Sequence, residues 1–454
     1  MTHQPATDTA GTGTDEPDTK LRRAVTGPLL YLFILGDVLG AGVYALVGEV
    51  AGEVGGAIWV PLLVALLLAL LTAASYAELV TKYPRAGGSA VFAERAFRSP
   101  VVAFLVGFCM LAAGVTSAAG LALAFAGDYL AVFLDVPAAP AALVFLLAVA
   151  LLNARGIRES LRANLVMTLV ETSGLVLVVV LGAVVLSRGD GDLGRSVEFP
   201  PGVSAATATL SAALLAYYSF VGFETSANVA EEVRDVRRVY PRALFGALLT
   251  AGLVYVLVGI AAAVVLPPGD LAGSSGPLLE VVRAADAGIP DSLFSLVALI
   301  AVANGALLTM IMASRMAYGL AEQHLLPAVL GRVLPHRRTP WVAIAVTTLV
   351  AMGLSLAGDL ATLANTVVLL LLFVFLSTNT AVLVLRRDRV EAPHFRVAAV
   401  VPVLGVVSCL VLLWQQEART WAFAGVLLAV GVLLYLVTAL PRRRAEARER
   451  TPVS

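Results

Sequence analysis

Apolar runs of about 20 residues recur along almost the whole chain, and they constrain the fold more than any other feature. A helix of that length crosses roughly 30 Å of hydrocarbon. The composition agrees, because 59% of the 454 residues are hydrophobic and only 14% are charged, against about a quarter charged in soluble domains. We therefore predict an all-α integral membrane protein. Its twelve expected spans are residues 28–51, 57–81, 99–130, 138–154, 162–187, 204–229, 241–266, 291–322, 340–357, 359–385, 397–415 and 419–440.

The basic residues predict the topology of these spans. Cytoplasmic loops carry an excess of lysine and arginine. With the N-terminus placed inside, 26 of the 31 basic residues fall in the predicted inner segments. Residues 1–26 are polar and Thr-rich and have no cleavable signal pattern, which is typical of a disordered cytoplasmic tail. Residues 441–454 form a second, basic tail, so we expect a multi-pass protein of the cytoplasmic membrane with both termini inside.

Two of the spans contain residues that a simply packed helix does not need. The first contains Gly40–Gly42, and glycine tolerates torsions that other residues resist. The sixth places Ser219, Gly222 and Glu224 in the middle of an apolar run. An ionised glutamate at mid-membrane is costly unless it faces water or a partner. Close packing of small residues explains the first span alone, but it leaves Glu224 unexplained, so we predict that both spans are broken helices.

Broken spans at matching positions in two halves indicate a substrate site between the repeats of a transporter. The halves are residues 27–187 and 204–385, joined by an outer loop at 188–203 and followed by two extra spans within 386–440. At a break, free N–H groups bind an anion and free C=O groups accept from a cation. An α-amino acid carries both charges on one carbon, so the two breaks together predict an amino acid substrate.

The same segments resemble the amino acid/polyamine/organocation permease superfamily, and the likeness is greatest to its prokaryotic and cationic amino acid permeases. The matching stretches on spans one, two, six and eight are GAGVYALVG, YAELVTKYPRAGGSAVF, FVGFETSANVAEEVRDVRRVYPRAL and SRMAYGLAEQHLLPAVL. The resemblance implies a 5+5 inverted-repeat transporter fold with helices 1 and 6 broken and two extra helices. It also implies a secondary active transporter that works by alternating access.

The resemblance further implies which residues form the site. Backbone groups at the two breaks bind the carboxylate and the ammonium, and an aromatic side chain closes over the substrate. The implied substrate-binding residues are Val38, Leu39, Gly40, Ala41, Gly42, Thr116, Ser117, Tyr218, Ser219, Val221, Gly222, Glu224 and Thr309. The implied gate is Tyr218 with Phe220, for which contact with the core or with lipid is the alternative.

Span five departs from the family pattern. Many proton-coupled members carry a lysine there that reaches toward the first break, whereas this chain has Glu171. A carboxylate cannot imitate an ammonium, but a buried carboxyl group can cycle protons. We therefore take Glu171 as the candidate coupling residue. A structural hydrogen bond, a cation-binding role and a pairing with a positive substrate group stay open as alternatives.

Three further charges lie within or at the end of spans. Glu78 is expected to form an ion pair with an arginine of an inner loop. Arg315 is expected near the cytoplasmic end of span eight, within reach of an acidic residue in 231–235. Asp37 lies one residue before the expected pocket, where we favour a partner on another helix over a direct role in the pocket.

Other functional classes fit this sequence less well. All four histidines fall in the tail or in inner loops, and both cysteines lie within spans, so we predict no enzyme, no cofactor and no metal site. Channels usually repeat one pore unit, which this chain does not, and a sensor with a transporter fold would bind without flux. We expect the uptake of a neutral or cationic amino acid together with a proton. Polyamine transport and amino acid exchange are the alternatives.

The expected partners follow from this interpretation. They are the amino acid, a co-transported proton and membrane lipid, with no nucleic acid. The overall charge of zero indicates no outside partner. The oligomeric state and the direction of transport are left open by the sequence.

Overall fold

The computed structural model describes residues 25–40, 42–84, 88–155, 160–334, 337, 339–390 and 392–449. Within these ranges the regular structure consists of α-helices and short 3-10 helices, with no β-strand. The all-α prediction is therefore confirmed for the part of the chain that the structure describes.

Every predicted span coincides with a helix or a pair of helices. Nine spans of the described residues are long and apolar enough to cross a membrane. They are α3 (Trp59–Lys82), α5 (Pro100–Phe125), α7 (Ala138–Arg155), α8 (Ser160–Arg188), α9 (Ala205–Tyr218) with η2 (Phe223–Glu232), α10 (Val236–Val265), α13 (Asp291–Glu322), α15 (Leu360–Leu385) and α17 (Ala418–Glu449). The bent pair α1 (Gly27–Leu39) and α2 (Gly42–Val54) is a tenth. The shorter apolar helices α14 (Trp341–Ala357) and α16 (Val400–Trp414) occupy the ninth and eleventh predicted positions.

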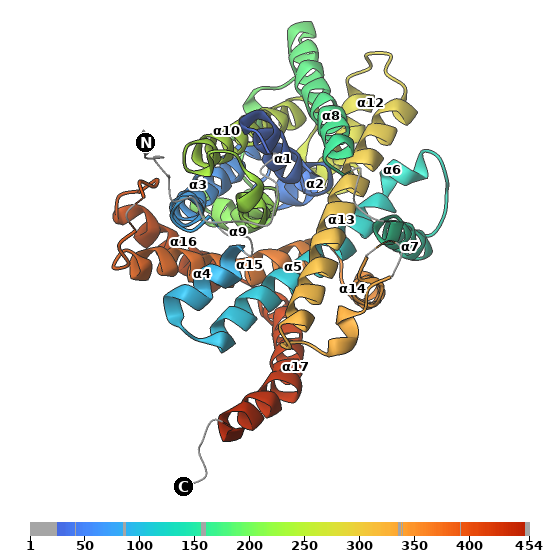
Figure 1. Cartoon of the computed structure of the whole chain (residues 1–454). Coiled ribbons are helices and arrows are strands. Elements are labelled where there is room, and N and C mark those ends of the chain that lie inside the picture. The colour runs from blue at the N-terminus through green and yellow to red at the C-terminus, as the bar shows by residue number, and fades with distance from the viewer. Residues whose placement is uncertain are drawn as a thin grey trace, which may run out of the picture.

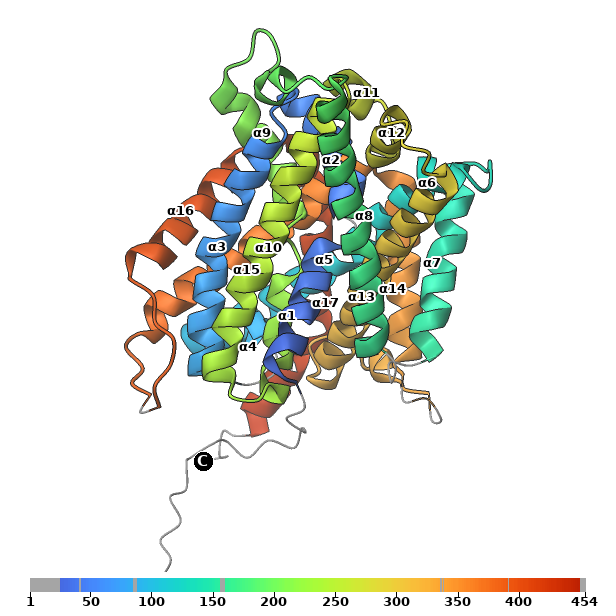
Figure 2. The same cartoon turned by 90° about the horizontal axis from the view of Figure 1, so that it is seen from above.

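The long helices run side by side between two faces of the molecule (Figure 2). We call the face at which α1 begins the lower face; α4 (Gly88–Phe97) lies near it and α17 ends there. The opposite, upper face carries α6 (Asp128–Ala131), α11 (Pro268–Ala272) and α12 (Pro277–Ala284). Two short 3-10 helices, η1 (Gly194–Val197) and η3 (Ala328–Gly331), complete the described elements.

The two bent spans lie at the centre of the packing. α1 packs against α10 and α8, and α2 packs against α9. α5 packs against both α13 and α15, whereas α7 and α16 lie at opposite edges of the molecule (Figure 1). The edge helices expose large apolar side chains such as Leu151 on α7 and Val407 on α16. In a bilayer these side chains face lipid, so the buried interior between the central helices is where a polar site can lie.

Candidate substrate site

The first break separates α1 from α2. α1 ends at Leu39, and Gly40 leaves the helical region with φ −37° and ψ −162°; the predicted Ala41 lies outside the described residues. Gly42 begins α2 in close contact with the second break, because a Cβ atom on Gly42 would lie 2.8 Å from the Cα of Ser219. A glycine is therefore needed at this position by the approach of the two backbones.

The second break follows the end of α9 at Tyr218. Gly222 has φ +127°, a conformation that favours glycine. A Cβ atom there would lie 2.8 Å from the carbonyl oxygen of Asp37. The Gly222 N–H donates to the carboxylate of Glu224 at 2.9 Å. Glu224 thus satisfies a backbone N–H group at the break, which accounts for a glutamate in an apolar run.

One hydroxyl group contacts both breaks. The Oη atom of Tyr255, on α10, lies 2.5 Å from the carbonyl oxygen of Val38 and 3.1 Å from that of Ser219. Phe220 packs edge-to-face on the Tyr255 ring, with 5.3 Å between the ring centroids. Tyr255 could not be recognised in the sequence, because one tyrosine within an apolar span gives no signal until the two breaks are placed beside it.

A cavity of about 1660 Å³ reaches both breaks. Its lining continues to Glu94, Glu232 and Gln323 near the lower face, and no residue of α6, α11 or α12 is among the described residues that line it. The cavity therefore extends from the breaks toward the lower face. The predicted residues that line it are Val38, Gly40, Gly42, Ser117, Tyr218, Ser219, Val221, Gly222, Glu224 and Thr309.

Three of the predicted substrate-binding and gate residues are described but do not line this cavity. Leu39 is fully buried, and Thr116 donates its hydroxyl to the carbonyl of Ala112 within α5 at 2.8 Å. Phe220 is fully buried against Tyr255. The two implied gate residues therefore differ: Tyr218 lines the cavity, and its hydroxyl lies 2.8 Å from that of Ser117, whereas Phe220 does not line it.

The sequence profile described as amino acid permease matches residues 29–439. The chain belongs to the amino acid permease family. It is 30% identical over 433 residues to an uncharacterized transporter of Mycobacterium tuberculosis, covering 95% of this chain and 94% of that protein.

Two relatives from Bacillus subtilis have more specific names. The methylthioribose transporter is 27% identical over 92% of this chain and 93% of its own length. The branched-chain amino acid permease BcaP is 25% identical over 92% of this chain and 94% of its own length. With the apolar helices, the family makes this permease a multi-pass membrane transporter and not an enzyme.

Glu171 lies on α8 in the permease and is fully buried outside the cavity lining. The amide of Asn304 donates to its Oε1 atom at 2.9 Å, and the Tyr44 hydroxyl donates to its backbone carbonyl at 2.7 Å. Its Oε2 atom has no hydrogen-bond partner among the described residues. A buried polar atom left without a partner is uncommon and calls for an explanation.

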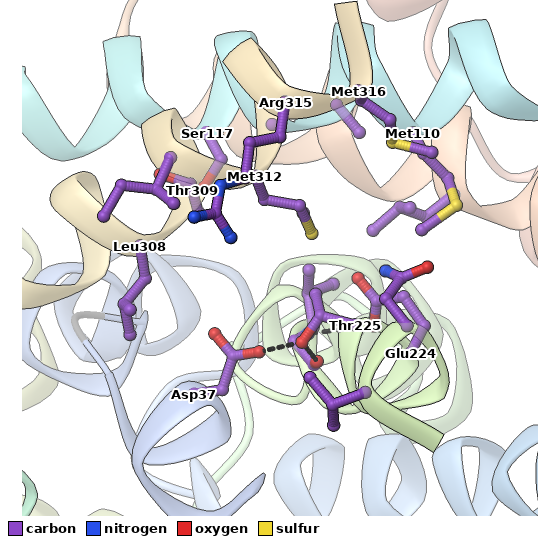
Figure 3. Close-up of a pocket in the computed structure, with 18 of the residues that line it drawn as sticks. Asp37, Met110, Ser117, Glu224, Thr225, Leu308, Thr309, Met312, Arg315 and Met316 are labelled. Carbon is purple, nitrogen blue, oxygen red and sulfur yellow. Dashed lines mark hydrogen bonds between the residues drawn. The ribbon is translucent and has the colours of Figure 1, made fainter. Parts of the chain in front are cut away.

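Asp37 and Arg315 enter the cavity from different helices of the permease. The Thr225 hydroxyl donates to the carboxylate of Asp37 in a short hydrogen bond, and Asp37 lines the cavity. Figure 3 shows Asp37, Thr225 and Glu224 on one wall and Arg315 with Met312 on the facing wall. Asp37 thus has both the partner on another helix that we favoured and a place in the cavity.

The expected partner of Glu78 is present at the lower face of the permease. The Arg386 guanidinium donates to both carboxylate oxygens of Glu78, at 3.2 and 2.9 Å. The Val397 N–H also donates to Glu78, at 3.0 Å. The predicted ion pair of Glu78 with a loop arginine is confirmed, and it fixes the loop between α15 and α16 to the end of α3.

The upper face of the permease is closed by contacts around Asp128. Its carboxylate accepts from the Ser274 hydroxyl at 2.9 Å and from the N–H groups of Ser275 and Gly276 at 2.8 and 3.2 Å. In return the Ser275 hydroxyl accepts from the Asp128 N–H at 2.9 Å. These bonds hold the segment between α11 and α12 to the start of α6, on the side away from the cavity.

Proposed function

We propose that this permease is a secondary active transporter that moves amino acids across the cytoplasmic membrane by alternating access. The observation that carries the proposal is the cavity that reaches both helix breaks from the lower face while α6, α11 and α12 are bonded together above. The basic loops favour the lower face as the cytoplasmic one. The structure then corresponds to the inward-open stage of a transport cycle, with both termini in the cytoplasm.

The substrate we propose is a neutral or cationic amino acid. Free backbone groups beside Gly40–Gly42 would bind its carboxylate, and those of Ser219–Gly222 its ammonium. Tyr218 would close over it. The branched-chain permease supports an amino acid, whereas the methylthioribose transporter has a name that points to another substrate. Polyamine transport and amino acid exchange stay as the alternatives.

Proton coupling through Glu171 is the second part of the proposal. Glu171 lies on α8, which packs against α1, and one of its carboxylate oxygens has no hydrogen-bond partner among the described residues. A protonated carboxyl needs no buried counter-charge, whereas an ionised one does. Proton loading and release at Glu171 would therefore be linked to movement of the first broken helix.

The test is uptake of radiolabelled amino acids and putrescine into proteoliposomes, with and without an inward proton gradient. Wild type, Glu171→Gln and the matched control Glu417→Gln are compared, because Glu417 is exposed just before α17. We expect gradient-stimulated uptake of at least one amino acid by wild type and the control. Glu171→Gln should lose the stimulation and keep uptake down a substrate gradient.

Each other outcome overturns a stated part of the proposal. Equal stimulation of Glu171→Gln and wild type would exclude Glu171 as the coupling residue. Uptake only into vesicles preloaded with amino acid would identify an exchanger, and uptake of putrescine alone a polyamine transporter. Binding of an amino acid without any flux would exclude transport in favour of a sensor.

A further inference from the structure

More acidic than basic residues line the cavity. Four lining residues are acidic, and Arg315 is the single basic residue among those that the structure describes; the acids are Asp37, Glu94, Glu224 and Glu232. Arg315 is exposed to the cavity and makes no hydrogen bond or ion pair within the described residues; of the acidic residues expected near it, Glu232 is the one that interacts with its charge. A charge within a membrane span faces water or a partner, so this guanidinium is available to a ligand that enters the cavity.

Asp37 offers the opposite charge from the facing wall. The Thr225 hydroxyl holds one of its oxygens, and the carboxylate points into the space toward Arg315 (Figure 3). Glu224 is less available, because it caps Gly222 and is only 2% exposed. Thr225 therefore acts as a positioning residue that aims the Asp37 carboxylate into the cavity.

Asp37 lies beside the second break, against Gly222, and Arg315 lies between the breaks and the lower face. Arg315 follows Thr309 by six residues on α13, which is about 9 Å along the helix axis. Asp37 precedes Gly40 by three residues on α1, which is about 4.5 Å. A molecule that moves from the breaks to the lower face starts beside Asp37 and passes the level of Arg315.

We infer that Asp37 and Arg315 form a second site, built from side chains, for the two charges of an α-amino acid. Asp37 binds the ammonium, and the planar guanidinium of Arg315 binds the carboxylate through two parallel N–H···O bonds. The inference rests on the proposed function, in which the cavity carries an amino acid. Met110, Met312 and Met316 line the space nearby, and their flexible apolar side chains can pack against substrate side chains of different shapes.

This site selects between the two substrate classes that the sequence left open. An amine without a carboxylate leaves Arg315 unpaired and adds a like charge beside it, so it is disfavoured. Arg315 is thus a specificity-determining residue that favours amino acids over their decarboxylated amines.

The experiment compares pairs of competitors that differ by one charged group. Uptake of a labelled amino acid into proteoliposomes is inhibited by L-lysine against cadaverine, and by L-leucine against isoamylamine or 4-methylpentanoate. Wild type, Arg315→Gln, Arg315→Lys and Asp37→Asn are tested. Arg155→Gln is the matched control, because Arg155 is exposed at the end of α7 and does not line the cavity.

We expect wild type and the control to prefer the amino acid over the amine by about tenfold or more, as for a charge-assisted pair. Arg315→Gln should reduce this preference to within about threefold, and Arg315→Lys should retain part of it. Asp37→Asn should instead reduce the preference for L-leucine over 4-methylpentanoate. If Arg315→Gln abolishes uptake, the same panel is measured on Arg315→Lys and by thermal-shift binding.

Three results would overturn the inference. The first is an active or binding-competent Arg315→Gln with the wild-type preference for the amino acid over the amine. The second is an inactive Asp37→Arg variant that regains uptake when Arg315→Asp is added. The two side chains would then form an ion pair with each other and not a site for the substrate. The third is a wild type that binds the amines as tightly as the amino acids. If wild type shows no flux, the proposed transport function is rejected but this inference is not, because thermal-shift binding of the same compounds still tests the site.

Discussion

At the scale of single residues, Gly222 and Gly42 keep the two helix breaks in contact because neither carries a side chain. Gly222 lies against the carbonyl of Asp37 in a left-handed conformation, and Gly42 lies against Ser219. The Tyr255 hydroxyl then joins the carbonyls of Val38 and Ser219. The proposed substrate site is therefore a contact between two interrupted backbones that a third helix holds together.

Replacing Gly222 tests this contact. Gly222→Ala should lower the stability by about 1–3 kcal/mol, because φ +127° is strained for alanine and the added Cβ displaces the Asp37 carbonyl. Uptake should fall with it. Gly353→Ala on α14 is the control, since no atom lies within 4 Å of its added Cβ, and its stability should be unchanged or slightly higher. Thermal unfolding in detergent measures both, and equal values for the two variants would contradict the close approach.

The sequence could predict the breaks because glycines and a glutamate are conspicuous in an apolar run. It could not predict that Ser117 lines the cavity and that its neighbour Thr116 does not. Both lie on α5, which is apolar on every side, so no periodic pattern shows which face meets the cavity. Tyr255 and Thr225 were missed because their importance lies in partners far away in the chain, Val38 and Asp37.

At the scale of elements, α15 illustrates how the end of a span is fixed. Asp359 caps the helix: its carboxylate accepts from the Thr362 N–H at 2.7 Å and from the Thr362 hydroxyl at 3.0 Å. Arg419, just inside α17, lies 3.0 Å from the same carboxylate. The cap also defines where the chain re-enters the membrane after α14, which agrees with the predicted start of that span.

Removing this cap gives a prediction with a defined dependence on pH. Asp359→Ala should cost about 1 kcal/mol, and Asp359→Asn much less, because asparagine also caps helices. Burial raises the pKa of the Asp359 carboxyl, but the bonds from Thr362 and the charge of Arg419 outweigh it, so the pKa lies below its usual 3.8. A lowered pKa stabilises the fold above pH 3.8, and this contribution is lost as the pH falls through the lowered value.

The thermal unfolding midpoints of wild type and Asp359→Ala should therefore differ by a constant amount from about pH 8 to about pH 5 and converge below the usual pKa of the carboxyl. Asp359→Asn serves as the control for the loss of charge alone. A difference that already closes between pH 7 and pH 5 would show that the carboxylate is not held as described.

At the scale of the whole molecule, the two faces differ in how they are closed. Above the breaks, the Asp128 carboxylate joins the start of α6 to the segment between α11 and α12. Below them, the cavity runs between α13 and η2 to the lower face. The sequence predicted the spans and the positions of the breaks, but not this asymmetry. Which face is open depends on contacts between distant loops, and those leave no periodic signal.

The upper closure makes its own prediction. Asp128→Ala should weaken it, because three donors lose their common acceptor, and amide hydrogen exchange of residues 267–284 should become about tenfold faster, equivalent to about 1.4 kcal/mol. Asp270→Ala is the control, since Asp270 is exposed on α11. Unchanged exchange in Asp128→Ala would mean that other contacts keep the upper face closed.

The size and one-sided opening of the cavity also bear on inhibition. At about 1660 Å³ the space is much larger than one amino acid, so it has room for a bulky compound. Such a compound could enter only from the lower face while the protein is in this state. It would compete with substrate released on that side, yet substrate added on the other side would not displace it. The same inhibitor would then differ in potency and in type of inhibition, competitive or non-competitive, between transport measured from one side and from the other.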